Sequence, residues 1–232
     1  CCMSIGLGIL IAFDKSFDRR TRWVALLAFL ALMWAVVTSS SRGGFLGLVA
    51  AIMGLWYVAD KKVQWLFSGV LILLIGGALA LSLLPPEYVR DMGTISDPND
   101  STRVERFHSW WIGWYMAVDN PLLGVGAGNY AWNVSSYEQL SPYYEWGGRS
   151  LGGRVSHSLW FTLIPEMGGL GVFLYACLIW VYYKTYLRIR KYCKQAAFLQ
   201  RFPQAKSLNK GLLVGLGSYV IAGTFISVLW YP

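Results

Sequence analysis

Six apolar stretches constrain this chain more than any other feature, because several approach the length that a helix needs to cross a bilayer. The clearest stretch, 63–84, has only Gln64, Ser68 and Ser82 as polar side chains. Charged residues make up 14% of the chain, against about 25% in soluble domains, so the polar surface is too small to cover a water-soluble particle. We predict an all-α fold, a polytopic transmembrane helix bundle. The six stretches are 1–13, 23–39, 45–59, 63–84, 157–183 and 211–231.

The first stretch is too short to span, and we expect it to be a truncated helix with further spans before it. The other stretches divide the chain into three parts. Residues 1–84 hold transmembrane helices with short connections, 85–156 form one long loop, and 157–232 hold transmembrane helices with a basic connection.

Positive charge gives the orientation of these spans. Most of the 20 basic residues lie in three connections that share one side of the membrane if the spans alternate. Lys and Arg close to span ends are retained on the cytoplasmic face, so the long loop 85–156 is expected on the opposite face. The basic residues of that opposite side are all arginine: Arg42, Arg90, Arg103, Arg106, Arg149 and Arg154. A guanidinium binds phosphate or carboxylate through two parallel hydrogen bonds, although chance explains six arginines about as well.

The long loop contains a predicted amphipathic helix. Ser101 or Thr102 caps it, and it ends near Asn120 and Pro121. Its apolar side chains recur at helical spacing and form one aromatic stripe, so the helix is expected to lie along the membrane interface. The stripe is either an interfacial anchor or a platform on which sugars stack. Its members are Phe107, Trp110, Trp111, Trp114, Tyr115 and Val118.

Several charged residues near this helix are candidates for chemistry. Arg103 and Arg106 sit on the rim of the stripe, where they bind either an anion or lipid headgroups. Asp97 and Asp100 form either a divalent-cation pair or, more simply, a turn. The glycine-rich segment 122–130 is predicted to be a tight turn, because it lacks the spacing of a dinucleotide-binding loop.

His157 and Glu166 stand at the start of the fifth stretch. Histidine suits general-base chemistry near neutral pH, while a histidine at a span end is also a common interfacial residue. An ionisable group inside an apolar stretch is costly and therefore a functional candidate. Since Pro165 interrupts the helix beside it, we favour a structural or positioning role for Glu166.

Three segments together resemble the membrane O-antigen ligase and polymerase family. The first is 41–45 (SRGGF), similar to the family's SRGG stretch. The second is Arg106 and Trp110 followed by 120–130 (NPLLGVGAGNY), and the third is 157–159 (HSL) with Glu166, Gly168 and Gly171. Ser158 stands where the family commonly has Asn. The family includes O-antigen ligases, O-antigen polymerases and protein O-oligosaccharyltransferases.

The resemblance implies a metal-independent, inverting glycosyltransferase that uses no cofactor. It would move a glycan from a polyprenyl diphosphate carrier to an acceptor hydroxyl on a glycan, lipid or protein, at the periplasmic face of the bacterial inner membrane. Arg42 and Arg106 would bind the diphosphate, with Arg103 as a weaker candidate, and His157 would be the catalytic residue that takes the acceptor proton. A solute transporter, for example of bicarbonate, is the alternative from another class.

Overall fold

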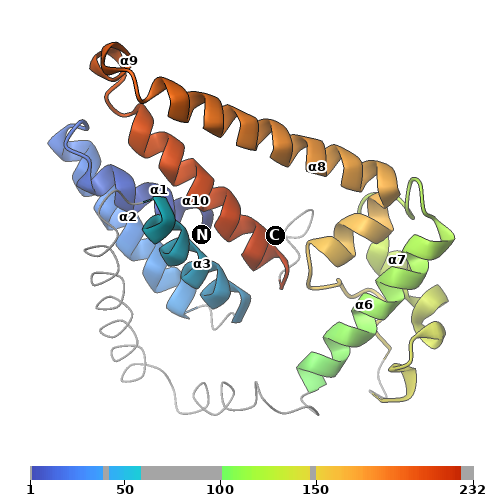
Figure 1. Ribbon diagram of the computed structural model, residues 1–232. Helices are drawn as coiled ribbons and strands as arrows, with labels where there is room; N and C mark the ends of the chain where they lie inside the picture. Colours follow the sequence, from blue (N-terminus) through green and yellow to red (C-terminus); the bar gives the residue numbers. More distant parts are fainter. Residues whose placement is uncertain (1, 39–41, 59–100, 147–149, 226–232) are drawn as a thin grey trace. The chain divides into compact units, whose positions relative to one another are not determined.

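The computed structural model (Figure 1) describes residues 2–38, 42–58, 101–146 and 150–225. Within these ranges every regular element is an α-helix or a short 3-10 helix, and no strand occurs. The all-α prediction is therefore confirmed. One described helix, α8 (Trp160–Tyr192), is long and apolar enough to cross a membrane, and two shorter apolar segments run over Ser4–Phe13 and Leu46–Val58. The predicted span 63–84 lies outside the described residues, so the polytopic arrangement stays a prediction.

The other predicted stretches are helical over nearly all of their described length, with Thr224 and Phe225 in a turn. They correspond to α1 (Cys2–Phe13), α2 (Arg19–Thr38), α3 (Arg42–Val58) and α10 (Ala205–Gly223). Helix α2 begins before its apolar run because Asp18 caps it, accepting a hydrogen bond from the backbone N–H of Thr21 at 3.0 Å. The end of the last predicted stretch, 226–231, is outside the described residues.

The chain divides into two compact units, of which the first contains the described residues within Cys1–Pro85 and Trp180–Ala222. Helix α1 packs against α2 and α3, and Val214 of α10 joins their apolar core. A Cβ at Gly6 would lie 2.5 Å from Val214 Cγ1, so the small residue lets the helices approach closely. The core residues are Ile5, Ile9, Phe29, Val36, Leu48, Ala51, Leu55, Val58 and Val214.

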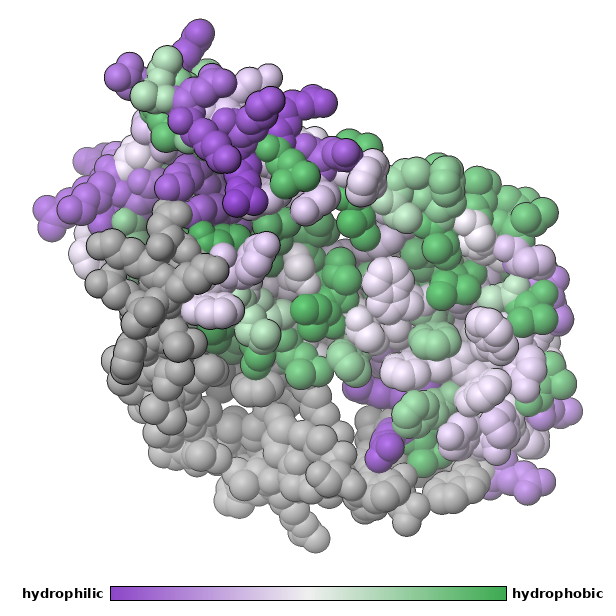
Figure 2. Space-filling view, in the orientation of Figure 1, coloured by the Kyte–Doolittle hydropathy of each residue, from purple (hydrophilic) through white to green (hydrophobic). Residues whose placement is uncertain are grey.

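Hydrophilic side chains gather at the end of this unit that contains the short helix α9 (Ala196–Arg201), as Figure 2 shows. The turn after α1 lies at the same end, because the side-chain amide of Gln204 donates to the carbonyl of Ser16 at 3.3 Å. These two connections were predicted to share one side of the membrane. Their proximity within the unit is what an alternating arrangement of spans requires.

The second unit contains the described residues within Pro86–Ile179 and Gly223–Pro232. Its elements are α6 (Ser101–Asp119), α7 (Tyr130–Tyr137), the 3-10 turns η2 (Glu138–Leu140) and η3 (Tyr144–Trp146), and the first part of α8. Helix α6 is the amphipathic helix that the sequence predicts in the long loop. Its inner face packs on α7 and forms a core of Ile112, Met116, Tyr130, Val134 and Leu151.

Helix α8 is broken at Gly168, which has φ 57° and ψ −162°. An unbroken helix would bond the N–H groups of 169 and 170 to the carbonyls of 165 and 166. Here those N–H groups donate instead to the carbonyls of Pro121 and Leu122, at 2.7 and 3.1 Å. In return, the N–H groups of 125 and 126 donate to the carbonyls of 165 and 166, at 2.8 and 2.9 Å. The turn after α6 thus satisfies the backbone groups that the break exposes.

Two glycines make this exchange possible, and they provide a test of it. A Cβ at Gly124 would lie 2.5 Å from the carbonyl oxygen of Pro165, and one at Gly168 would lie 2.6 Å from that of Leu122. Both positions also have positive φ. We expect Gly124→Ala and Gly168→Ala to destabilise the protein by about 3 kcal/mol or more, because backbone clash adds to left-handed strain.

Gly153→Ala is the matched control, since Gly153 has φ 79° but nothing within 4 Å of the added Cβ. It should cost only the strain of about 1 kcal/mol. Thermal unfolding of the purified protein in detergent measures all three variants. Equal losses of melting temperature in the three would contradict the close approach of the two backbones.

Candidate active site

Helix α6 carries two of the arginines that the sequence singles out. Arg103 and Arg106 lie one turn apart near its N-terminus. The guanidinium carbon of Arg103 is 5.7 Å from the centre of the Phe107 ring, so this side chain rests on the aromatic stripe while remaining exposed. Arg106 is half-buried on the same helix. Both arginines thus come from the first turns of α6, and the guanidinium of Arg103 lies over the Phe107 ring.

His157 lies in the loop that leads into α8, three residues before the helix begins at Trp160. Its φ is 53°, and among the described residues no other non-glycine has a positive φ. The neighbours Ser156 and Ser158 are almost fully buried, whereas His157 is exposed. A backbone conformation that few side chains adopt thus presents the imidazole to the outside of this unit.

The charges around His157 come from α6 and from the loop. Partial burial lowers the pKa of His157, and the guanidinium groups of Arg106 and Arg154 lower it further, while Glu105 opposes them. Arg154 is itself paired with Glu105 at 3.0 Å. The imidazole is consequently favoured in its neutral form, which can accept a proton. Arg106, Arg154 and Glu105 are thus the charged neighbours that act on the imidazole.

Glu166 is fully buried and holds the turn between α6 and α7. Its carboxylate accepts hydrogen bonds from the backbone N–H groups of Gly128 and Tyr130, each at 2.9 Å. The hydroxyl of Tyr130 in turn donates to the carbonyl of Ser109 on α6 at 2.6 Å. These contacts favour the positioning role expected for Glu166 over a direct role in chemistry.

The structure does not describe the side chains of the remaining predicted site residues. Arg42 begins α3 in the first unit, and its side chain lies outside the described part of the chain. Asp97 and Asp100 also fall outside the described ranges. Among the side chains that the structure describes, no three His, Cys, Asp or Glu residues are grouped so that they could hold a metal ion.

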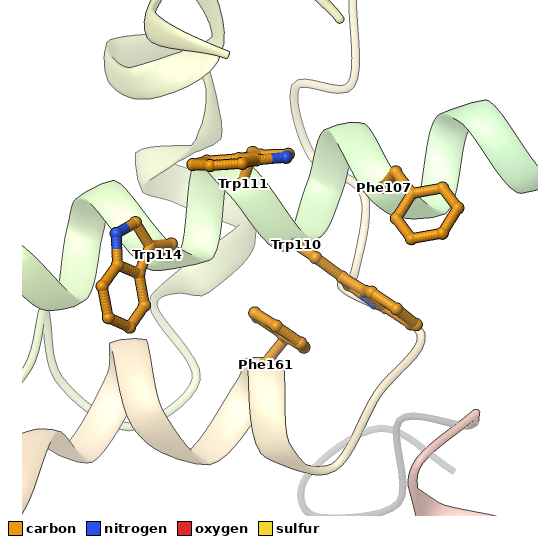
Figure 3. Close-up of a pocket in the computed structure, with 5 residues that line it drawn as sticks. All are labelled: Phe107, Trp110, Trp111, Trp114 and Phe161. Atoms are coloured by element: carbon orange, nitrogen blue, oxygen red, sulfur yellow. The ribbon is translucent and has the colours of Figure 1, made fainter. Parts of the chain in front are cut away.

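The aromatic stripe of α6 forms one wall of a pocket of about 430 Å³ (Figure 3). The volume is within the range of about 300 to 1,000 Å³ that is common for ligand pockets. Trp110 stacks on Phe161 of α8, with ring centres 5.0 Å apart and planes within 2°. The lining is aromatic throughout and consists of Phe107, Trp110, Trp111, Trp114 and Phe161.

Sequence reasoning missed several buried polar residues close to the site. Ser156 and Thr162 form a hydroxyl pair 2.8 Å apart, and Glu138 accepts a hydrogen bond from the Ser150 hydroxyl at 2.8 Å. His108 on α6 is 5% exposed, and its Nε2 has no hydrogen-bond partner. Of the two histidines of the chain, His157 is therefore the exposed one. The serines on both sides of His157, with Thr162 four residues after Ser158, were the available signal.

Substitution of Glu166 tests its positioning role. Glu166→Gln keeps the shape but turns an amide donor toward one of the two N–H groups, so we expect a loss of about 2 kcal/mol in the free energy of unfolding. Glu166→Ala should cost more, because both buried donors then lack a partner. Denaturant titration in detergent measures both, with the exposed Glu145→Gln as control. Wild-type stability of Glu166→Gln would contradict the contact.

Comparison with known proteins gives the family. No curated protein and no solved structure matches the chain. A family model described as O-antigen ligase matches residues 24–176, more than half of the chain. The match covers α6, the glycine-rich turn, His157 and the break in α8. The chain therefore belongs to the O-antigen ligase family of membrane enzymes, which includes ligases and polymerases.

Proposed function

We propose that this protein is a metal-independent, inverting glycosyltransferase. It moves a glycan from a polyprenyl diphosphate carrier to an acceptor hydroxyl at the periplasmic face of the inner membrane. The observation that carries the proposal is the placement of Arg106 near an accessible His157 whose pKa is lowered. The guanidinium of Arg106 suits a departing diphosphate, and the imidazole of His157 suits an attacking hydroxyl. Glycan transfer needs both groups at one place.

The proposed reaction is a single displacement. The acceptor oxygen attacks the anomeric carbon from the face opposite the carrier, and its proton passes to the neutral imidazole of His157. The bond between the anomeric carbon and the phosphate oxygen breaks, and the diphosphate leaves with the electron pair. Arg106, with Arg103 more weakly, stabilises the charge that develops on it, and the family resemblance of the sequence implies the same role for Arg42. Attack from the opposite face inverts the anomeric configuration.

The aromatic pocket agrees with a lipid-linked donor. Its lining is apolar, and the indole N–H of Trp110 already donates to the carbonyl of Ser156 at 3.1 Å. A sugar would need hydrogen-bond partners beside a stacking ring, whereas an isoprenoid chain needs none. We therefore favour the apolar part of the carrier over a sugar as the group that contacts this stripe. An interfacial anchor remains compatible with the same surface.

The transporter alternative is weaker on this geometry. Transport sites are built at broken helices whose free backbone groups and buried charges meet the solute. The break in α8 has its carbonyls bonded to the turn 125–126, and the Glu166 carboxylate accepts two backbone N–H groups. These carbonyl and carboxylate groups already accept hydrogen bonds within the protein, so they do not face a solute. Solute uptake by vesicles that lack any lipid-linked glycan would nevertheless favour transport.

Glycan transfer in proteoliposomes tests the proposal directly. The donor is a polyprenyl diphosphate-linked glycan, offered with lipid A core, a glycan or a protein as acceptor, which also decides between ligase, polymerase and protein transferase. We expect His157→Ala and Arg106→Ala each to lower kcat by about 10²-fold or more. Arg106→Lys should recover only part of the rate, because an ammonium cannot bind phosphate bidentately.

Arg190→Ala, which removes an exposed arginine in the last turn of α8, is the control and should transfer at the wild-type rate. Insertion of every variant is checked by its yield in the membrane fraction. Normal transfer by His157→Ala would eliminate His157 as the base.

The pH dependence of transfer gives a second test, in which the direction of each shift is predicted. His157 must be neutral to accept a proton, so the rate falls below its pKa, and a lowered pKa extends activity toward acid pH. Arg154→Gln removes a positive neighbour and leaves Glu105 uncompensated, so the acid limb of the profile should move to higher pH. Glu105→Gln should move it to lower pH. Two unshifted profiles would show that another group titrates.

A further inference from the structure

The backbone around His157 needs an explanation that the proposed reaction does not supply. A non-glycine residue at φ 53° adopts an uncommon left-handed conformation, which the surrounding structure must hold in place. Ser156 is 0% exposed and Ser158 is 1% exposed, so His157 is held between two buried residues. The contacts of these neighbours therefore decide where the imidazole points.

The buried hydroxyl groups of Ser156 and Thr162 form hydrogen bonds across the loop that contains His157. The hydroxyls of Ser156 and Thr162 lie 2.8 Å apart, and they are 3.0 and 2.7 Å from the carbonyl oxygen of Ser158. The N–H of Ser158 also points at the Ser156 hydroxyl, at 3.3 Å. These bonds join the residue before His157 to the residue after it, and both to the first turn of α8. The loop is thereby prevented from relaxing to negative φ.

A second set of contacts joins the loop to α6. The indole N–H of Trp110 donates to the carbonyl of Ser156 at 3.1 Å, and the Ser109 hydroxyl approaches the same oxygen at 3.3 Å. The Ser109 hydroxyl also donates to the carbonyl of Arg106 at 2.8 Å, so Trp110 is the donor committed to Ser156. Trp110 is in turn fixed by its stacking on Phe161. The helix that carries Arg106 thus fixes the residue that precedes His157.

We infer that Trp110, Ser156 and Thr162 are positioning residues, which hold the His157 imidazole at a set place beside Arg106. The inference rests on the proposed function, because it assumes that His157 takes the acceptor proton. None of the three touches the reacting atoms. Their hydrogen bonds fix the separation between the base and the diphosphate-binding arginine, and such alignment contributes strongly to the rate of a transfer between two bound substrates.

Thr162→Val is the main test, because it removes the hydroxyl and keeps the branched shape. With the loop released, the imidazole samples other positions, and we expect kcat to fall about tenfold or more while the KM for the donor changes less than about twofold. Trp110→Phe, which keeps an aromatic ring but removes the N–H donor, should act in the same direction. Thr162→Ser restores the hydroxyl and should recover most of the wild-type kcat.

Thr185→Val is the matched control. Thr185 also lies in α8, and its hydroxyl donates to the carbonyl four residues before it at 2.8 Å. Thr162 makes the same kind of hydrogen bond. The same substitution there removes the same kind of hydrogen bond without touching the loop. It should leave kcat unchanged. Wild-type kcat in Thr162→Val, or an equal loss in Thr185→Val, would overturn the inference.

The pH profile separates positioning from simple loss of folded protein. The charged groups that face His157 are Arg106 and Glu105 on α6 and Arg154 in the loop. A released loop lets the imidazole gain water and leave Arg106, so the acid limb of the Thr162→Val profile should move to higher pH. Partial unfolding would lower the rate equally at every pH, and that result would overturn the inference.

The His157→Ala background distinguishes failure of the inference from failure of the proposed function. If His157 is the base, adding Thr162→Val to His157→Ala should not lower the residual transfer further. A further tenfold loss there would show that Thr162 acts independently of His157 and would overturn the positioning role. Full transfer by His157→Ala alone would instead refute the base assignment in the proposed function.

Discussion

The exchange of backbone hydrogen bonds between the break in α8 and the turn after α6 is the contact on which the second unit depends. Pro165 and Gly168 prevent α8 from continuing through 165–169, and a broken helix in a buried place leaves polar groups that must find partners. The turn 121–126 supplies them. Glu166 extends the same junction to α7 through two further N–H groups. One local defect in a helix thus joins three helices at a single point.

The electrostatics of the site follow from that junction. With α6 fixed against α8, Arg106 and the loop residue His157 face the same region, and the arginine lowers the pKa of the imidazole. An anionic diphosphate bound at the guanidinium would offset this effect. The pKa of His157 would then rise, and the imidazole would become a stronger base in the complex than in the free enzyme. In the proposed function, the arginine that binds the donor would therefore also tune the basicity of His157.

The first unit is held together differently. Its helices approach through small residues such as Gly6 and Gly54, which lie against Val214, and the side-chain amide of Asn209 donates to the carbonyl of Tyr186 at 3.1 Å. Small residues that allow close contact between helices are typical of helix packing where the surroundings are lipid. The exposed apolar residues of α2 and of the part of α8 in this unit, among them Trp34 and Val181, agree with this environment.

The sequence by itself determined the helical fold, most of the helix positions, the amphipathic α6, the glycine-rich turn and the candidates Arg106, His157 and Glu166. These features depend on local periodicity, on capping and on the cost of charge among apolar residues, all of which a linear pattern records. Only the tertiary structure decided which N–H groups Glu166 accepts, that Trp110 and Thr162 hold the loop of His157, and that Arg154 pairs with Glu105. Those contacts join residues up to about fifty positions apart in the sequence. Their geometry depends on how the break in α8 and the turn after α6 supply hydrogen-bond partners to each other's backbone groups, which no local pattern encodes.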